Sequence, residues 1–348
     1  MKKFLSILMA VTMMATVLAG CGAKEEQSTP TTSTPATSTP ATSTPDATEV
    51  DTNTVAIGAI VLARDDISED EIYTFTSTIF ENIEAITAQH AKGAELSLEY
   101  AASMTSVPYH PGAAKYFAEK GIEVASVKEG AGTGAARGSL TFGTGGESGT
   151  YYAFGGVLGA YVSNNTDLSI TTVTSGGSAV NIDDMVADNV QIAFCQSDVM
   201  AYAYNGERLF EGAAVKDFSV VAALYMEAVQ IVTNNPEIKT VADLAGKKVS
   251  VGAAGSGTYF NAIDALEAYG MTEDDIEPVY QSFGDSTESL KDGKIDAAFV
   301  VAGAPTTSIV DLATATDVYL VAVDGAEAEA MLAASPYYST YVIPAGTY

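Results

Sequence analysis

The tetrapeptide Ser-Gly-Thr-Tyr occurs twice, at Ser148–Tyr151 and Ser256–Tyr259, each time between a strand-like run and a helix-like run. A repeat this short is expected by chance, so its setting carries more weight than its letters. A helix that begins in such a glycine-rich loop presents unpaired backbone N–H groups and the positive end of its dipole. Two such helix starts, one in each of two lobes, would hold a small anionic or zwitterionic solute between them.

Short apolar runs alternate with helical stretches over residues 140–323, which predicts an α/β body with mostly parallel sheets. Val220–Leu224 and Val229–Thr233 are predicted to form one long crossing strand, interrupted near Tyr225–Ala228. Val55–Ala63 is predicted to form a buried strand. Ligands of such sheets bind beyond the carboxyl ends of the strands, where the Gly/Ser/Thr loops of this chain lie.

The first residues have the pattern of a secretory signal. A charged start is followed by the apolar run Phe4–Leu18 and then by Leu-Ala-Gly-Cys at Leu18–Cys21. Those four residues resemble the bacterial lipobox, which predicts a lipidated Cys21 and a place on the extracytoplasmic face of the bacterial cell membrane. The alternative is an ordinary signal with an incidental cysteine. Residues 27–48 are almost entirely Ser, Thr, Pro and Ala, and we expect them to form an extended tether.

Composition shifts predict the domain organisation and a hinge. The expected parts are a signal peptide (1–20), a lipid-anchored tether (21–50), two parts of the first lobe (51–127 and 139–225) with a flexible joint between them (128–138), a second lobe (226–318), and a strand that returns to the first lobe (319–348). The hinge is expected near Tyr225–Val229 and Tyr319–Val323, so that closure would bring the loops at Ser148 and Ser256 together.

The formal net charge is −28, from 44 acidic and 16 basic side chains. A strongly acidic surface repels phosphate backbones, so nucleic acid is excluded as a partner. The same charge disfavours an anionic ligand unless helix dipoles dominate locally.

Hydroxyl and amide side chains, glycines and aromatic rings gather in the loops that follow the strands. Such groups orient a carboxylate or an amino acid without a buried ion pair. Helix capping by the hydroxyl groups and core packing by the rings are the alternative interpretations. The predicted ligand-binding residues are Gly146, Ser148, Gly149, Thr150, Tyr151, Tyr152, Thr174, Ser175, Ser178, Gln196, Ser197, Tyr225, Ser256, Gly257, Thr258, Phe283 and Gly303.

The sequence gives little support for a catalytic function, and no catalytic residue, metal or cofactor is predicted. The loop Gly143–Gly149 has the glycine density of a phosphate cradle but lacks the lysine of a P-loop. The chain has two histidines without metal-ligand spacing, and no Gly-x-Ser-x-Gly nucleophile elbow. Cys195 is expected to be a small core residue. Arg64 could reach a ligand carboxylate, although pairing with Asp65 or Asp66 is favoured.

Motifs over nearly all of Ser139–Tyr348 resemble the TAXI family of solute receptors from tripartite ATP-independent periplasmic (TRAP) transporters. The matching segments are Leu140–Gly146, Gly149–Tyr152, Ser175–Ser178, Gln196–Val199, Ala223–Tyr225, Val251–Ala253, Gly255–Thr258, Asp292–Phe299, Gly303–Thr306 and Ile343–Tyr348. The resemblance implies a two-lobed type II periplasmic-binding-protein fold with an interlobe cleft. It also implies capture of a small organic acid or amino acid, such as glutamate or a related dicarboxylate, for a sodium-coupled membrane permease.

The order of segments departs from that family. Val55–Gly121, with Ala63–Asp66 and His110–Ala113, resembles the family's C-terminal portion, yet here it comes first. The chain therefore looks circularly permuted, with Lys128–Arg137 joining the old ends. Two other functions stay open, a ligand-sensing lipoprotein without transport and an enzyme on the same fold. Permease genes beside this one would favour transport, and an acid–base pair with perturbed pKa values in the cleft would favour an enzyme.

Overall fold

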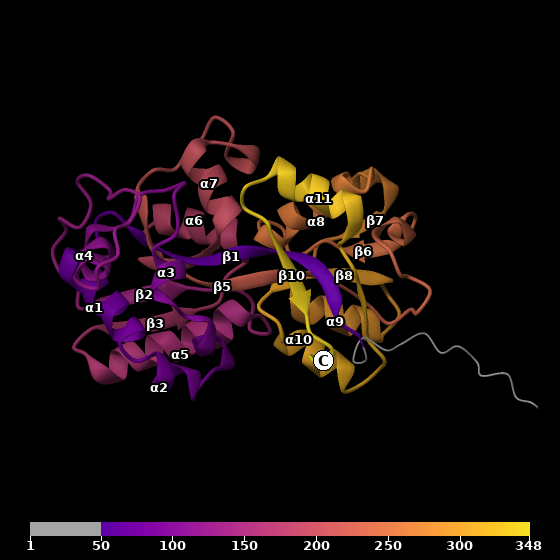
Figure 1. Ribbon diagram of the computed structural model, residues 1–348, viewed down its shortest axis with the longest axis horizontal. Helices are drawn as coiled ribbons and strands as arrows, with labels where there is room; N and C mark the ends of the chain where they lie inside the picture. The colour runs from indigo at the N-terminus through magenta and orange to yellow at the C-terminus, as the bar shows by residue number, and fades with distance from the viewer. Residues whose placement is uncertain (1–49) are drawn as a thin grey trace, which may run out of the picture. The chain divides into compact units, whose positions relative to one another are not determined.

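One continuous sheet of ten strands runs through the computed structural model, which describes residues 50–348. The strands are β1 (Thr52–Arg64), β2 (Ser139–Gly143), β3 (Ser169–Val173), β4 (Ile192–Gln196), β5 (Phe218–Thr233), β6 (Lys248–Ser250), β7 (Glu277–Val279), β8 (Ala297–Ala302), β9 (Tyr319–Val321) and β10 (Ser339–Ile343). Their order is β3-β2-β4-β1-β5-β8-β6-β7, with β10 beside β1 and β9 beside β5 (Figure 1). Strands β2, β3 and β4 are mutually parallel, as are β6, β7 and β8.

Helices cover both ends of this sheet and separate it into two lobes. The first lobe carries α1 (Glu69–Phe80), α2 (Ile83–Thr87), α3 (Leu98–Ala101), α4 (Pro111–Glu119), α5 (Thr150–Asn165), α6 (Ser178–Val186) and α7 (Ser197–Asn205), with the 3-10 turns η1 (Ala91–Glu95) and η2 (Arg208–Phe210). The second carries α8 (Gly257–Ala268), α9 (Phe283–Lys291), α10 (Thr307–Ala313) and α11 (Gly325–Ala334), with η3 (Val241–Leu244) and η4 (Glu273–Asp275). Each lobe has its own apolar core, so the predicted two-lobed α/β fold is confirmed.

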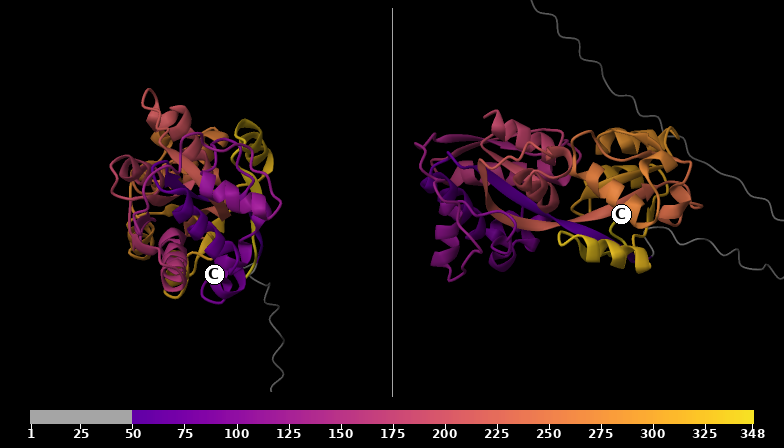
Figure 2. Two further views of the ribbon diagram at one scale, coloured as in Figure 1. Left: turned by 90° about the vertical axis from the view of Figure 1, so that its left-hand side faces the viewer. Right: turned by 90° about the horizontal axis from the view of Figure 1, so that it is seen from above.

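Two long antiparallel strands, β1 and β5, join the lobes (Figure 2). Strand β1 pairs with β10 over its first residues and with β4 from Ala59 onward. Strand β5 pairs with β8 from Ala228 onward. The predicted interruption at Tyr225–Ala228 is wrong, because β5 is continuous and only its register against β1 shifts, between Ala59 and Ile60 and again between Val61 and Leu62. The apolar side chains on both faces of this strand are buried by the two lobes.

The last segment of the chain, 319–348, stays with the second lobe rather than returning to the first, which corrects the prediction. Strand β9 pairs with the end of β5, and β10 pairs with Thr52–Ala56 at the start of β1. Val321, Met331 and Tyr338 are buried in the second-lobe core, so apolar burial holds the segment there. Tyr319–Val323 therefore does not cross between the lobes, and the crossing segments lie in β1 and β5.

The expected joint, 128–138, forms no helix or strand. Its end is fixed to α1, because the backbone N–H groups of Arg137 and Gly138 donate to Oε1 of buried Glu71 at 2.7 and 2.8 Å. Flexibility of the joint stays a prediction. The signal peptide, the lipidated Cys21 and the tether lie outside the described residues, apart from residue 50 at the tether's end.

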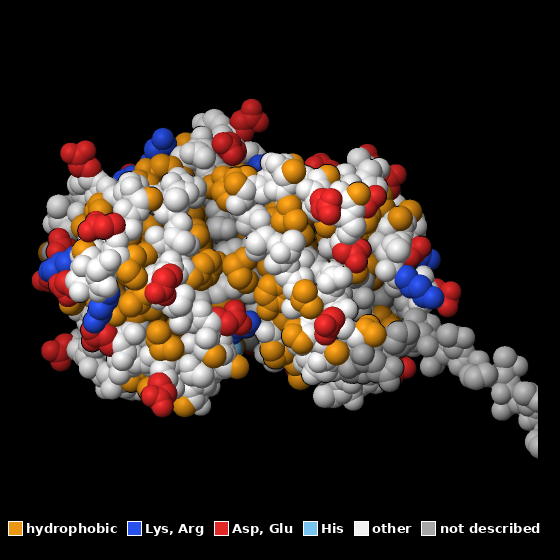
Figure 3. All heavy atoms as spheres, viewed as in Figure 1, with side chains coloured by type: hydrophobic (Ala, Val, Ile, Leu, Met, Phe, Trp, Pro, Cys, Tyr) orange, Lys and Arg blue, Asp and Glu red, His pale blue; other side chains and the backbone are white. Residues whose placement is uncertain are grey.

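Within residues 50–348, no helix is both long and apolar enough to cross a membrane. Acidic side chains are scattered over the face shown in Figure 3, which is hollowed between the two halves.

Candidate ligand-binding pocket

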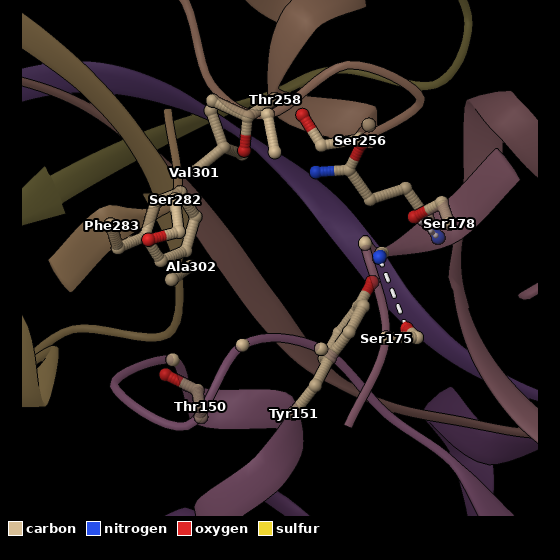
Figure 4. Close-up of a pocket in the computed structure, with 18 of the residues that line it drawn as sticks. Thr150, Tyr151, Ser175, Ser178, Ser256, Thr258, Ser282, Phe283, Val301 and Ala302 are labelled. Atoms are coloured by element: carbon tan, nitrogen blue, oxygen red, sulfur yellow. Dashed lines mark hydrogen bonds between the residues drawn. The ribbon is translucent and has the colours of Figure 1, made fainter. Parts of the chain in front are cut away.

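A cavity of about 140 Å³ lies where the carboxyl ends of the parallel strands of the two lobes face one another. The loops after β2 and β3 and the last residue of β4, Gln196, line it from the first lobe. The loops after β6 and β7 and the end of β8, Val301 and Ala302, line it from the second. Figure 4 shows Thr150 and Tyr151 on the α5 side, with Ser256, Thr258 and Phe283 facing them from the second lobe. This is the edge of an open α/β sheet at which ligands bind.

On the first-lobe side, helix starts without side-chain caps open toward the cavity. Neither Gly149 before α5 nor Gly177 before α6 offers a side-chain cap, so the N–H groups of the first turn of α5 are open to a ligand. In the first turn of α6, the N–H of Ala179 is already used by a hydrogen bond to the second lobe. Gly177 has φ of 103°, a conformation that favours glycine. Ser175 Oγ accepts a 3.0 Å hydrogen bond from its N–H, the dashed line in Figure 4, which fixes this loop.

On the second-lobe side, Ser256 caps α8 and its Oγ accepts from the N–H of Tyr259 at 3.3 Å. Capping uses one lone pair of this hydroxyl oxygen, and its O–H group stays at the cavity as a donor. The next residue, Gly257, lies against the buried Gln196 side chain of the first lobe, since a Cβ there would be 1.7 Å from Gln196 Oε1. Only glycine allows this approach of the two lobes.

Direct contacts close the two lobes around the cavity. The backbone N–H of Ala179 donates to the carbonyl oxygen of Gly255 at 3.1 Å. Thr150 Oγ1 donates to the carbonyl oxygen of Gly303 at 3.0 Å. Arg208 also pairs with Asp264 at 2.7 Å. The structure therefore shows the lobes in a closed arrangement.

Glu227 on β5 is the site residue that sequence reasoning missed. It lines the cavity with 2 % of its surface exposed, and Tyr151 donates a 2.7 Å hydrogen bond from its hydroxyl to Glu227 Oε2. Burial raises the pKa of Glu227 to about 8, against the lowering effect of the Tyr151 hydrogen bond. Burial also raises the pKa of Tyr151 well above its ordinary value. A lone acid inside the apolar run of β5 is the sequence signal that could have found it.

Asp198 at the start of α7 is a second buried acid where the lobes meet. It is fully buried, and its Oδ2 accepts a 3.0 Å hydrogen bond from Asn261 Nδ2 of α8 in the second lobe. Burial raises the pKa of Asp198 to about 7. Tyr338 donates to Asp264 at 2.9 Å and accepts from Asn261 at 2.7 Å, so a polar cluster joins α7 to α8.

The structure brings most of the predicted site residues together at the cavity and leaves the others outside. Those that line it are Gly146, Gly149, Thr150, Tyr151, Ser175, Ser178, Gln196, Ser256, Gly257, Thr258 and Phe283. Those that do not are Ser148, Tyr152, Thr174, Ser197, Tyr225 and Gly303.

The residues left outside have other structural roles. The Ser148 carbonyl oxygen accepts from the N–H of Ser308, and Ser197 Oγ accepts from the N–H of Gly58. Tyr225 is buried among Phe154 and Phe194. Thr174 is exposed, and Tyr152 on α5 is half-buried. At Gly303, the absence of a side chain makes room for Lys92 and Tyr225.

Other predicted features lie away from the cavity. Arg64 pairs with Asp66 at 2.8 Å and does not line the cavity, in agreement with the favoured interpretation. Cys195 is fully buried in the first-lobe core, as expected. In the part of the chain that the structure describes, no group of His, Cys, Asp or Glu side chains is arranged to hold a metal ion.

Two α/β lobes, two crossing strands and a cavity lined from both lobes define the fold of a type II periplasmic binding protein. The chain matches the model of the NMT1-like family over residues 12–121 and 142–348, and it belongs to that family.

Similar solved structures include three binding proteins. The alkanesulfonate-binding protein SsuA from Xanthomonas axonopodis pv. citri bound to MOPS is 19% identical with a TM-score of 0.38, over 54% of this chain and 61% of that one. Holo ArgBP from T. maritima is 18% identical with a TM-score of 0.36, over 53% and 77%. A binding protein of an ABC uptake transporter from Streptococcus pneumoniae with bound histidine is 13% identical with a TM-score of 0.35, over 54% and 76%. The chain thus spans less than two thirds of the length of SsuA.

Proposed function

We propose that this protein is an extracytoplasmic solute receptor that captures a small organic acid or amino acid, glutamate or a related dicarboxylate among them. The observation that carries the proposal is the cavity between the lobes, lined by the first turns of α5 and α8. Free N–H groups at a helix start bind an anionic group without a side-chain cation. Membership of the NMT1-like family and the two-lobed fold support a binding function.

The proposed partner is the permease of a sodium-coupled TRAP transporter, with the receptor held at the membrane through a lipid on Cys21. Resemblance to the TAXI family supports the permease, and the lipobox-like residues support the anchor. A circularly permuted order is part of the same proposal. Pairing of Thr52 with Ile343, and a 2.9 Å hydrogen bond from the N–H of Ala345 to Asp51, support it because a permutation requires neighbouring ends.

A thermal-shift and calorimetry screen of the purified protein tests the binding function. The panel contains glutamate, glutamine, 2-oxoglutarate and C4 dicarboxylates. We expect at least one member to raise the melting temperature and to bind with one-to-one stoichiometry. No shift with any member, together with turnover of one of them, would reject the receptor function.

The Glu227–Tyr151 pair favours one second candidate, an enzyme on the same fold, since both groups have perturbed pKa values in the cleft. Acid–base catalysis needs one group kept protonated and another kept ionised. Here burial raises both pKa values, which leaves both groups protonated at neutral pH and argues for binding. Incubation of each panel member with the protein, followed by NMR of the solute, distinguishes the two functions.

A further inference from the structure

The cavity is lined by a single carboxylic acid, Glu227. Among the described residues, Glu227 is the only ionisable side chain of the lining apart from Tyr151. The rest of the lining consists of glycine, alanine, valine, phenylalanine, serine, threonine and Gln196. No lysine, arginine or histidine lines it within the described residues. A solute that enters this cavity therefore meets backbone N–H groups and hydroxyls, and a single carboxyl group.

Within residues 50–348, that carboxyl group has no ion-pair partner of opposite charge. Tyr151 supplies a neutral hydrogen bond to Oε2 at 2.7 Å. Lys92, whose charge lowers the pKa of Glu227, forms its ion pair with Glu95 instead. A buried acid without a cation is held protonated or is neutralised by what binds beside it. A positively charged group on a solute would therefore find an uncompensated acid in Glu227.

An ammonium group on the solute would supply that charge, and the helix starts would hold a carboxylate. The pattern of N–H donors with a single acid complements a zwitterion better than a solute with two negative charges. The net charge of −28 acts in the same direction, because it disfavours a doubly anionic solute. No cation in the lining offsets that repulsion.

We propose that Glu227 selects the solute by pairing with its ammonium group, so that the pocket prefers an amino acid to the same acid without its amine. This rests on the proposed receptor function and narrows its class of solute. Binding ionises Glu227, and its proton leaves to the solvent. Other titratable groups interact electrostatically or by hydrogen bonding with this carboxyl group, so that its charge and theirs shift one another's pKa values. They are Tyr151, Tyr225, Tyr100, Cys195, Asp198 and Lys92.

Isothermal titration calorimetry on matched solute pairs tests this selection. Each pair shares a carbon skeleton and differs by the amine: L-glutamate with glutarate, L-aspartate with succinate, and L-alanine with propionate. We expect the amine-bearing member of the pair that binds to be at least tenfold tighter. At pH 7 we expect its binding heat to differ between phosphate and Tris buffers, because the released proton is taken up by the buffer.

Two variants complete the design. Glu227→Gln keeps the shape of the side chain and removes its charge, and we expect it to weaken the amine-bearing member at least tenfold and to abolish the proton release. Glu147→Gln, an exposed acid near the cavity that does not line it, is the matched control and should leave both unchanged.

Three outcomes decide the inference. Equal affinity within the pair that binds would overturn it and leave the receptor function standing. If Glu227→Gln is folded by circular dichroism and still binds the amine-bearing solute more tightly than its partner, the inference is also overturned and the receptor function stands. Should Glu227→Gln not fold, the affinity ratio and buffer dependence of the unmodified protein still decide. No heat from any pair would overturn the inference, and the wider thermal-shift panel together with the turnover assay would then decide the receptor function.

Discussion

Thr150, the first residue of α5, donates a 3.0 Å hydrogen bond from its Oγ1 to the carbonyl oxygen of Gly303, which follows β8 in the opposite lobe. Gly303 directly follows β8 of the second lobe, and Thr150 begins the helix that follows β2 of the first lobe. The hydrogen bond can form only while the lobes are closed, so it links the capture of a solute to the geometry of the cavity.

Replacing this hydroxyl should weaken solute binding. Thr150→Val keeps the size of the side chain and removes a hydrogen bond worth about 0.5–1.5 kcal/mol, so we expect affinity to fall about two- to tenfold. Calorimetry measures the change. Thr144→Val is the control, because Thr144 Oγ1 donates to Val173 within the first lobe, and it should alter stability without altering affinity. A fall in affinity of equal size in both variants would contradict the interlobe role.

Gly257→Ala should oppose closure of the lobes. The new Cβ would be 1.7 Å from Gln196 Oε1, and because Gln196 is buried we expect at least a tenfold loss of affinity. Gly257 begins α8, so the alanine should leave the melting temperature nearly unchanged. Gly156→Ala in the interior of α5 is the control, since its Cβ meets open space, and we expect it to stabilise by about 0.5–1 kcal/mol. Unchanged affinity in Gly257→Ala would mean that Gln196 moves aside freely.

The stability of the protein should fall as the pH rises from the ordinary pKa of an aspartate through the folded-state pKa of Asp198. That pKa, about 7, is above the ordinary value of 3.8, so the folded state binds the proton more tightly. The stabilisation is complete below about pH 4 and is lost as the pH rises to about 7. Asp198→Asn removes this dependence. Its gain in unfolding free energy over the unmodified protein should be larger at pH 8 than at pH 5, on the order of 2 kcal/mol.

Urea unfolding at the two pH values measures this difference. The exposed Asp183→Asn, for which no such gain is expected, is the control. A gain in Asp198→Asn that is the same at pH 5 and pH 8 would show that the buried carboxyl does not titrate in this range.

Glu71→Ala should loosen the segment 128–138. The variant removes the acceptor of the N–H groups of Arg137 and Gly138, and we expect it to cost about 2–4 kcal/mol of stability. Trypsin should then cleave faster after Lys128 and Arg137, which mass spectrometry detects. Cleavage at an unchanged rate would show that other contacts hold the segment.

Glu123→Ala is the control for this variant. Glu123 is exposed and makes no side-chain hydrogen bond among the described residues, so its replacement should leave the rate of cleavage and the unfolding free energy unchanged.

Local patterns predicted the elements of the fold well where strands and helices alternate. The alternation downstream of residue 140 indicated the α/β lobes, and the buried strand expected at Val55–Ala63 is the central part of β1. The route of the last thirty or so residues was missed, because neither periodicity nor capping states which lobe an amphipathic segment covers. Burial of Val321, Met331 and Tyr338 against the second lobe decides it.

The sequence by itself determined the loops of the pocket, because glycine at a tight turn and serine or threonine at a helix start act through the nearest few residues. Only the tertiary structure decided which of these loops meet. It also placed Glu227 at the cavity: a strand sends successive side chains to opposite faces, and what each face meets depends on residues far away in the chain. An acid in an apolar strand therefore became part of the pocket only when two lobes closed over it.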